Sequence, residues 1–246
     1  MSATPAWPPK SLPRLFVRQS LAEGGVAELD AAQANYLGNV LRMSAGAQLL
    51  LFDGCSGEWL AHVAEAGKKR MTLTIERKTR ESETIPDVWL AFAPVKRSQT
   101  DWLVEKATEL GVARLLPVVT QRTIAERVKL ERLQAITIEA AEQCGRTRLP
   151  DLAEPIPLTR LLKERDPERR LYFADEGGGE PLAKTLKAAA ALILTGPEGG
   201  FTDEERALVR TAPNSVAISL GPRILRAETA ALASLSAYMA LAGDWR

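Results

Sequence analysis

The chain has 246 residues, of which 46% are hydrophobic and 26% are charged, as in an ordinary soluble globular protein. Its formal net charge of +1 excludes binding to nucleic acid through a global positive field, so any such binding needs local basic patches. Two cysteines without metal or redox spacing indicate a reducing, cytoplasmic environment, and the lack of an apolar run of roughly 20 residues predicts no membrane partner.

The first third of the chain predicts a small β-barrel domain at residues 1–76. Its proline-rich start, 1–13, lacks the apolar core of a signal peptide and is interpreted as a flexible tail. One helix is expected at 30–41, with Asp30 as its N-cap and an apolar stripe of Tyr36, Leu37, Val40 and Leu41. Short strands separated by turns are expected at 15–17, 48–52, 58–64 and 70–76.

Residues 77–86 are charged and polar and are interpreted as a linker to a second domain, 87–246. Strands are expected there at 88–93, 115–119, 171–174, 191–195 and 216–220. Helices are expected at 99–110, 130–143, 182–189, 203–211 and 228–242, with Ser98 as the N-cap of the first and a Thr202–Glu205 capping box on the fourth. This alternation predicts an α/β class with a mostly parallel sheet and helices on its faces.

Two Gly-Pro corners follow the fourth and fifth of these strands. The first is Leu194-Thr195-Gly196-Pro197-Glu198-Gly199-Gly200, and the second begins at Leu220-Gly221-Pro222 and runs to Ala230. Neither is a Walker loop or a dinucleotide fingerprint. A single glycine-rich turn is equally typical of an ordinary strand exit. Two together predict a backbone-lined pocket at the carboxyl ends of the strands, suited to a flat heterocycle such as adenine.

Charged residues surround the second corner. Arg223 and Arg226 flank Ile224-Leu225, and their place beside a ligand corner favours phosphate or substrate binding over a solvated pair. Glu228 lies in the first turn of a helix, where the helix dipole stabilises a carboxylate without any other role. His62, the only histidine, lies in an expected strand and is interpreted as structural.

These motifs resemble those of the RsmE family, SPOUT-superfamily enzymes that methylate N3 of a specific uridine in 16S ribosomal RNA with S-adenosylmethionine. The two corners match the family's signature segments. Residues 102–111 and 139–146 resemble its first helix and the end of its second, and residues 12–17 and 36–42 resemble its amino-terminal PUA-like barrel. The family often has histidine before the Leu37 run, where this chain has Asn35-Tyr36, which leaves a detail of RNA contact open.

The resemblance implies a fold and a set of partners. The second domain would carry a trefoil knot, which no periodicity discloses. The protein would form a homodimer, bind S-adenosylmethionine without a metal, and act on 16S rRNA of the small ribosomal subunit. Two alternatives stay open: a related enzyme acting on tRNA, and an RNA-binding assembly factor without turnover.

The resemblance also assigns site residues. One wall of the cofactor pocket would consist of Leu194, Thr195, Gly196 and Gly200, and the other of Leu220, Ile224, Leu225 and Ala230, with Phe173 at the start of a third loop. Because uridine N3 carries a proton, a base or a stabiliser of the uracil anion is needed. Arg226 is the candidate stabiliser. Glu198 either acts as the base or braces its loop.

RNA contacts are expected from basic residues of both domains. Lys68, Lys69 and Arg70 lie at the start of the last barrel strand, and Arg77, Lys78 and Arg80 follow it. This basic cluster is either a solvated face or a phosphate-binding surface. Arg146 could instead serve the dimer interface together with Gln143. The candidates for RNA binding are Arg14, Arg42, Lys68, Lys69, Arg70, Arg146 and Arg223.

Overall fold

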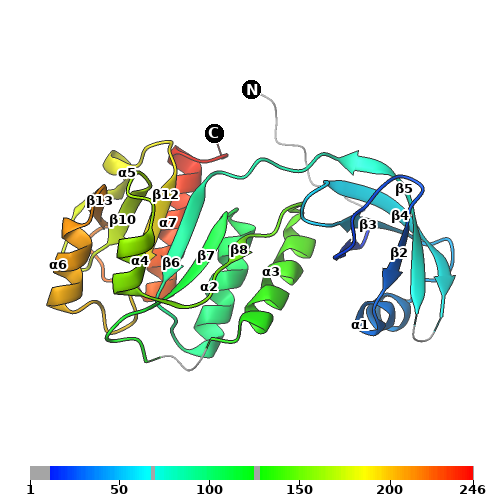
Figure 1. The fold of residues 1–246 in the computed structure, drawn as a ribbon, viewed down its shortest axis with the longest axis horizontal. Coiled ribbons are helices and arrows are strands. Elements are labelled where there is room, and N and C mark those ends of the chain that lie inside the picture. Colours follow the sequence, from blue (N-terminus) through cyan, green and yellow to red (C-terminus); the bar gives the residue numbers. More distant parts are fainter. Residues whose placement is uncertain (1–11, 68–69, 125–127, 246) are drawn as a thin grey trace. The chain divides into compact units, whose positions relative to one another are not determined.

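The computed structural model describes residues 12–67, 70–124 and 128–245 (Figure 1). The chain forms two compact units. One consists of residues 1–83 together with 142–148, and the other of residues 84–141 and 149–246. The interpreted tail, 1–13, lies almost wholly outside the described residues, as do Lys68 and Lys69.

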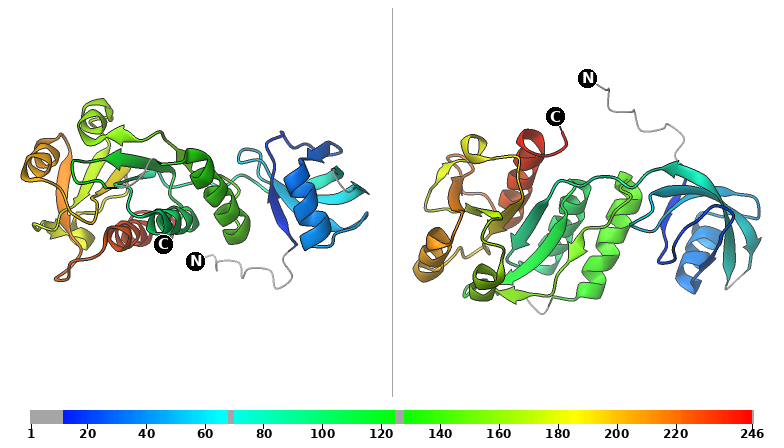
Figure 2. Two further views of the ribbon diagram at one scale, coloured as in Figure 1. Left: turned by 90° about the horizontal axis from the view of Figure 1, so that it is seen from below. Right: turned by 45° about the horizontal axis from the view of Figure 1, so that its top comes forward.

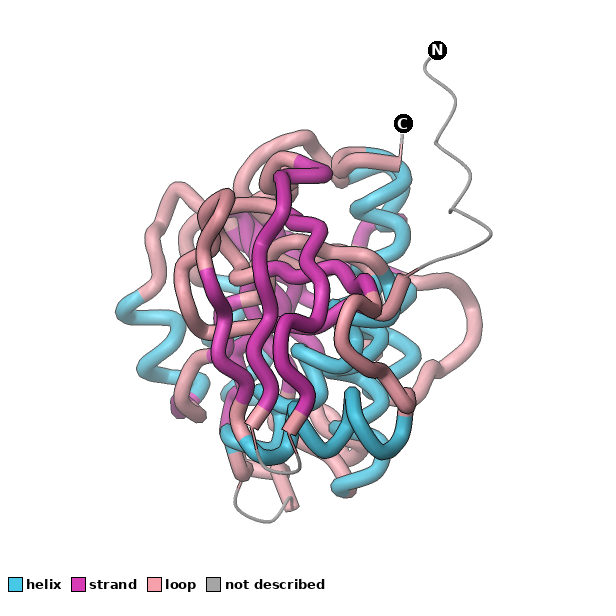
Figure 3. The backbone as a smooth tube through the Cα atoms, turned by 90° about the vertical axis from the view of Figure 1, so that its right-hand side faces the viewer, coloured by secondary structure: helices cyan, strands magenta, loops and turns pink. Residues whose placement is uncertain are grey.

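The smaller unit is built on a mixed sheet with the strand order β1-β3-β4-β5-β2. Figure 3 draws the strands of the protein in magenta. Its strands are β1 (Arg14–Phe16), β2 (Val26–Leu29), β3 (Gln48–Phe52), β4 (Glu58–Ala66) and β5 (Met71–Arg80). β1 pairs with β3 in parallel and the other neighbours are antiparallel. Alternate residues such as Leu49, Leu51, Leu73 and Ile75 are buried and form its core. β5 continues to Arg80, into the segment interpreted as a linker.

The expected helix at 30–41 is two short pieces, α1 (Ala31–Asn35) and a π-helical turn, η1 (Tyr36–Val40). Asp30 is the N-cap, as predicted, and forms a capping box with Gln33. The predicted apolar stripe is wrong: only Leu37 is buried, while Tyr36, Val40 and Leu41 are exposed. The reason is the change of helical period, because the stripe assumed hydrogen bonds four residues apart and Leu41 N donates to Tyr36 O, five residues back.

The larger unit is built on a parallel sheet with the order β11-β13-β10-β12-β6-β7-β8, and β9 pairs with β7. Its central strands are β6 (Val88–Phe92), β7 (Arg114–Val119), β10 (Arg170–Ala174), β12 (Ala191–Thr195) and β13 (Ser215–Ser219). The edge strands β8 (Asp151–Leu152), β9 (Ile156–Pro157) and β11 (Glu180–Pro181) are short. The predicted α/β class with a mostly parallel sheet is confirmed.

Helices cover both faces of this sheet (Figure 2). One face packs against α2 (Arg97–Glu109), α3 (Leu130–Cys144), α5 (Leu182–Thr185) and α7 (Ala227–Leu241), and the other against α4 (Leu158–Glu164) and α6 (Asp203–Thr211). The strands alternate between the two cores: Leu90 and Phe92 belong to the first, and Ala91 to the second. This arrangement buries all five residues of β12.

Two helix predictions need correction. α2 begins at Arg97, so the N-cap is Lys96 and not Ser98, and no side-chain hydrogen bond caps this helix. α5 ends at Thr185, well before the expected end at 189, because Leu186 is already extended. In contrast, Thr202 and Glu205 form the predicted capping box at the start of α6.

Candidate functional site

The first Gly-Pro corner is a tight turn fixed from two sides. Gly200 N donates to Pro197 O at 2.9 Å, which closes a turn centred on Glu198 and Gly199. Gly200 has φ +67°, a conformation that glycine adopts without strain. From outside the turn, Arg122 donates to Gly199 O at 2.9 Å and to Phe201 O at 3.3 Å. The turn is therefore held in place by the loop that follows β7.

The second corner is open to solvent. Gly221 has φ +103°, and no atom of the described part of the chain would lie within 4 Å of a Cβ atom there. The segment 221–224 is exposed, and Ile224 is 88% exposed. Arg226 is the N-cap residue of α7 and its side chain is exposed. Glu228 is buried, and its Oε2 has no hydrogen-bond partner among the described residues.

The residues assigned to the cofactor flank the ends of three parallel strands that are neighbours in the sheet, in the order β13-β10-β12. Phe173, Leu194 and Thr195 are buried in the strands, so only their backbone would face a ligand. Gly196 is packed against Phe201, whose ring would lie 2.6 Å from a Cβ atom on Gly196. This side of Gly196 is therefore filled and leaves no space for a ligand. Leu220, Leu225 and Ala230 are half-buried.

A cavity of about 600 Å³ opens on the other side of the first corner. Three loops line it, together with residues of α2 and α3. The loops follow β6, β7 and β12, which are adjacent parallel strands, so their carboxyl ends meet at one edge of the sheet. The apolar part of the lining is Pro94, Val95, Ile124, Val128, Leu133 and Pro197, and the charged part is Lys96, Arg97, Asp101, Arg122, Lys129, Arg132 and Glu198.

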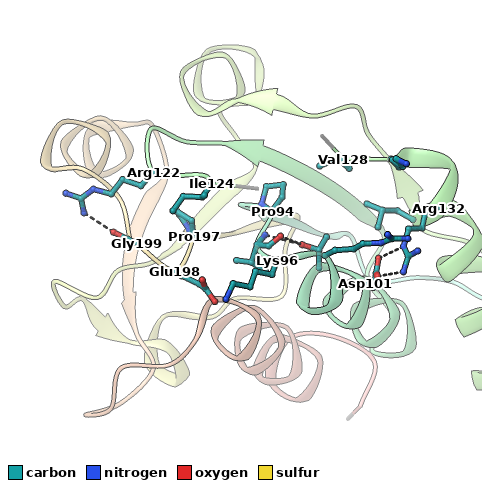
Figure 4. Close-up of a pocket in the computed structure, with 15 residues that line it drawn as sticks. Pro94, Lys96, Asp101, Arg122, Ile124, Val128, Arg132, Pro197, Glu198 and Gly199 are labelled. Carbon is teal, nitrogen blue, oxygen red and sulfur yellow. Dashed lines mark hydrogen bonds and ion pairs between the residues drawn. The ribbon is translucent and has the colours of Figure 1, made fainter. Parts of the chain in front are cut away.

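Some charged residues of the cavity form ion pairs with one another and others do not (Figure 4). Arg132 is held by both carboxylate oxygens of Asp101, with its Nε 2.9 Å from Oδ1. Lys96 and Glu198 point toward one another from opposite loops. Beside the first corner, hydrogen bonds from its own backbone N–H and from the Thr202 hydroxyl, together with Arg122, lower the pKa of the Glu204 carboxyl.

Sequence reasoning did not assign Lys96, Arg97, Lys129 or Arg132 to a site. No glycine-rich or motif-like signal marks their loops. What brings them to the first corner is strand order: β6 is the direct neighbour of β12, although about a hundred residues separate them in the chain. A parallel sheet places the loops that follow adjacent strands together, and this adjacency was the missing information.

Some of the residues predicted to bind RNA are buried and others are exposed. Arg14 is buried, pairs with Glu58 Oε2 at 2.8 Å and donates to Arg146 O at 2.7 Å. Arg146 is also buried, with its Nε 3.7 Å from Glu83 Oε1. Their burial argues against contact with RNA phosphate. Arg42, Arg70 and Arg223 are exposed, and Arg42 has φ +56°. Lys68 and Lys69 lie outside the described residues.

Two kinds of site are missing from the part of the chain that the structure describes. It holds no group of three or more His, Cys, Asp or Glu side chains suited to a metal ion. No helix within the same ranges has the length and apolar character needed to cross a membrane.

Comparison with known proteins defines the class first. A family model described as an RNA methyltransferase domain matches residues 81–239, and one described as an RNA methyltransferase PUA domain matches residues 29–76. Because the first match covers more than half of the chain, the protein belongs to the class of RNA methyltransferases.

Individual relatives narrow the class. The chain is 31% identical over 229 residues to ribosomal RNA small subunit methyltransferase E of Rickettsia conorii, which spans 91% of this chain and 93% of the relative. It is 34% identical over 236 residues to the enzyme of the same name from Synechocystis, spanning 93% and 77%. The crystal structure of ribosomal RNA small subunit methyltransferase E from Neisseria gonorrhoeae bound to S-adenosyl methionine aligns with a TM-score of 0.87 and 29% identity, covering 96% of this chain and 100% of that one.

The chain belongs to the family of ribosomal RNA small subunit methyltransferase E. The resemblance to the RsmE family inferred from the two corners is confirmed.

Proposed function

We propose that the protein transfers a methyl group from S-adenosylmethionine to N3 of a specific uridine in the 16S rRNA of the small ribosomal subunit. The observation that carries this proposal is the pair of Gly-Pro corners at the carboxyl ends of β12 and β13, in a chain that matches the Neisseria gonorrhoeae enzyme bound to S-adenosyl methionine over 96% of its length.

The described residues fit the cofactor. Leu220, Leu225 and Ala230 are half-buried and Gly221 is exposed, so the segment after β13 offers apolar side chains and accessible backbone to an adenine ring. Bound there, the sulfonium supplies an activated methyl group. The protein's own task is to align the uridine with it and to manage the N3 proton.

Two charged residues have proposed roles. Glu198 is exposed at the tip of its turn and lies between the cofactor corner and the cavity, so it is placed to take the N3 proton. Arg226 is exposed at the start of α7 and is assigned to the uracil anion or to an RNA phosphate. Exposed Arg42, Arg70 and Arg223 are assigned to phosphate contacts.

The test is methyl transfer from labelled S-adenosylmethionine to small-subunit RNA, followed by nucleoside mass spectrometry. We expect 3-methyluridine in the small-subunit RNA and none in tRNA. Methylation of tRNA alone would favour the alternative of a related enzyme that acts on tRNA. Binding of small-subunit RNA with no transfer would favour a non-catalytic assembly factor.

The Arg226 assignment is tested with Arg226→Ala, which we expect to lose turnover while it retains cofactor affinity in calorimetry. An equal loss of turnover and of cofactor affinity would place Arg226 at the cofactor instead.

We also infer a homodimer, acting in the cytoplasm where ribosomal subunits mature. Large apolar side chains stay exposed on the larger unit, with Trp102 45%, Leu241 49% and Trp245 54% exposed. A second copy that covers them would remove these apolar side chains from water. Sedimentation equilibrium should give twice the mass of 26.8 kDa. A single species of chain mass would contradict the dimer.

The trefoil knot stays a proposal as well. Its support is the order of the connections. The chain leaves β10, pairs β11 with the edge strand β13, packs α5 against α7 and then returns to β12. The last helix, α7, packs on β12 and β6 beneath this connection, as a threaded end would. Joining Met1 to Arg246 covalently should give an unfolded ring that retains a knot detectable by its compactness. An unfolded ring as expanded as an unknotted control ring would refute it.

A further inference from the structure

We propose that the cavity between the loops of β6, β7 and β12 receives the acceptor uridine, and that the Lys96 ammonium stabilises the uracil anion formed there. This inference rests on the proposed function and adds a site and a catalytic residue to it. The cavity volume of about 600 Å³ lies in the range typical of small-molecule sites and is ample for one nucleotide.

The position of the cavity separates it from the cofactor. The residues assigned to the cofactor follow β10, β12 and β13, whereas the cavity is lined by loops that follow β6, β7 and β12. Among the described residues, the turn at 197–200 is the only loop common to both sets. A methyl donor and its acceptor must meet in line at one point, and this turn is the one segment that borders both sides.

The lining suits a nucleotide. Ile124 and Val128 offer apolar surface for the faces of a pyrimidine ring, while the cationic side chains outnumber the two carboxylates, Asp101 and Glu198. Of the cations, Arg122 is engaged with the turn and Arg132 with Asp101. Within the described residues, no hydrogen bond or ion pair involves the side chains of Lys96, Arg97 or Lys129. These three are therefore available to an anionic ligand.

Lys96 is the best-placed of the three. Its carbonyl accepts from Gln99 N and Thr100 N, both at 3.0 Å, and the Thr100 hydroxyl bonds to the backbone of Val95 at 3.1 Å. The loop is thus fixed, and its side chain points toward Glu198 across the cavity (Figure 4). Helix stability does not explain a lysine here: an N-cap favours Ser, Thr, Asp or Asn, and the dipole disfavours a cation at this end.

The chemistry assigns one role to each of the facing groups. The N3–H bond of uracil breaks, its proton passes to the Glu198 carboxylate, and the electron pair remains on the ring, spread over N3, O2 and O4. Lys96 donates a hydrogen bond to the carbonyl oxygen where this charge develops. N3 then takes the methyl group as the carbon–sulfur bond breaks with its pair left on sulfur. Glu198 later returns its proton to solvent.

The experiment compares Lys96→Gln and Lys96→Arg with Lys163→Gln, which removes an exposed lysine of α4 outside the cavity. Each variant is assayed on small-subunit RNA from pH 6 to 9, and cofactor affinity is measured by calorimetry. We expect Lys96→Gln to lower kcat on the order of 100-fold at neutral pH with unchanged cofactor affinity, since removal of one anion-stabilising donor typically has this effect. Its rate should rise with pH as the uracil ionises by itself, and Lys96→Arg should recover part of the loss.

Two results would overturn the inference while the proposed function stands. One is a Lys96→Gln enzyme as active as Lys163→Gln at every pH. The other is a parallel loss of cofactor affinity, which would make the cavity part of the cofactor site. If the unmodified protein transfers no methyl group to small-subunit RNA, the proposed function itself is wrong, and the inference that rests on it is wrong as well.

Discussion

Gly199 and Gly200 are adjacent, yet the structure constrains them differently. Gly200 has φ +67°, and a Cβ atom on it would lie 2.2 Å from Glu176 Oε1. Gly199 has no positive φ, and its Cβ atom would contact Arg122 Cβ at 3.5 Å. We predict that Gly200→Ala costs about 1–2 kcal/mol of unfolding free energy, the cost of a left-handed conformation for alanine. Gly199→Ala should stay within about 0.5 kcal/mol of the parent in urea denaturation. Equal costs for both variants would refute this account of the turn.

Arg14 shows that a buried basic residue can pair within the protein instead of contacting RNA. Its side chain is 3% exposed, and its guanidinium lies 4.6 Å from the centroid of the Phe52 ring and pairs with Glu58, whose side chain is 8% exposed. The sequence suggested an RNA contact because an arginine near a barrel strand cannot be told from a buried one without the fold.

We predict that Arg14→Ala destabilises the protein by about 3 kcal/mol, the lower end of the cost of breaking a buried ion pair, because Arg80 remains as a partner of the buried Glu58 carboxylate. Arg18→Ala, which removes an exposed arginine nearby, is the matched control and should be near neutral in the same urea titration. An Arg14→Ala protein of unchanged stability that binds RNA more weakly would instead support the sequence hypothesis.

The hairpin between β3 and β4 depends on one carboxylate. Asp53 Oδ1 accepts from Cys55 N at 2.8 Å and from Ser56 N at 2.7 Å, and Oδ2 accepts from the Ser56 hydroxyl at 2.7 Å. Burial opposes ionisation, but these hydrogen bonds together with one from Leu21 N outweigh it and lower the pKa of Asp53 below its ordinary value. A lowered pKa in the folded state means that the charged carboxylate stabilises the fold.

We therefore predict that Asp53→Asn is less stable than the parent at neutral pH. The difference should stay constant down to about pH 5 and narrow as the pH falls below the ordinary aspartate pKa of about 3.9 and through the lower folded value. Thermal melts at several pH values measure it. Asp30→Asn is the control, since asparagine caps a helix as well as aspartate. A difference independent of pH would show that the charge of Asp53 does not matter.

Element by element, the sequence predicts what local chemistry determines. Thr202 and Glu205 mark the start of α6, and the apolar run 191–195 is β12 to the residue. Prediction from the sequence fails where an element depends on contacts with residues far away in the chain. The π-helical turn at 36–40 breaks the assumed period, and short β8, β9 and β11 become strands only by pairing with β7 and β13. The same limit hid Lys96, whose role depends on which strand lies next to β12.

The larger organisation departs from a simple succession of domains along the chain. Residues 142–148, the end of α3 and the loop after it, group with the N-terminal unit although the chain on both sides belongs to the other. Within that unit, Arg80 donates to Gly145 O, and Glu83 Oε1 accepts from Thr147 N and Arg148 N at 2.9 Å each. No sequence pattern shows such pairings, because they join residues more than sixty positions apart.

This organisation predicts a remote effect of Glu83. In Glu83→Ala, the amides of Thr147 and Arg148 lose their acceptor and buried Arg146 loses its nearby carboxylate, so the segment 142–148 should open more readily. Hydrogen exchange followed by mass spectrometry should show faster exchange there, with β12 unchanged. Glu81→Ala is the matched control, since that side chain is 82% exposed and pairs only with Lys78 among the described residues. Unchanged protection at 142–148 would mean that other contacts of the N-terminal unit hold the segment, and that Glu83 does not determine its place there.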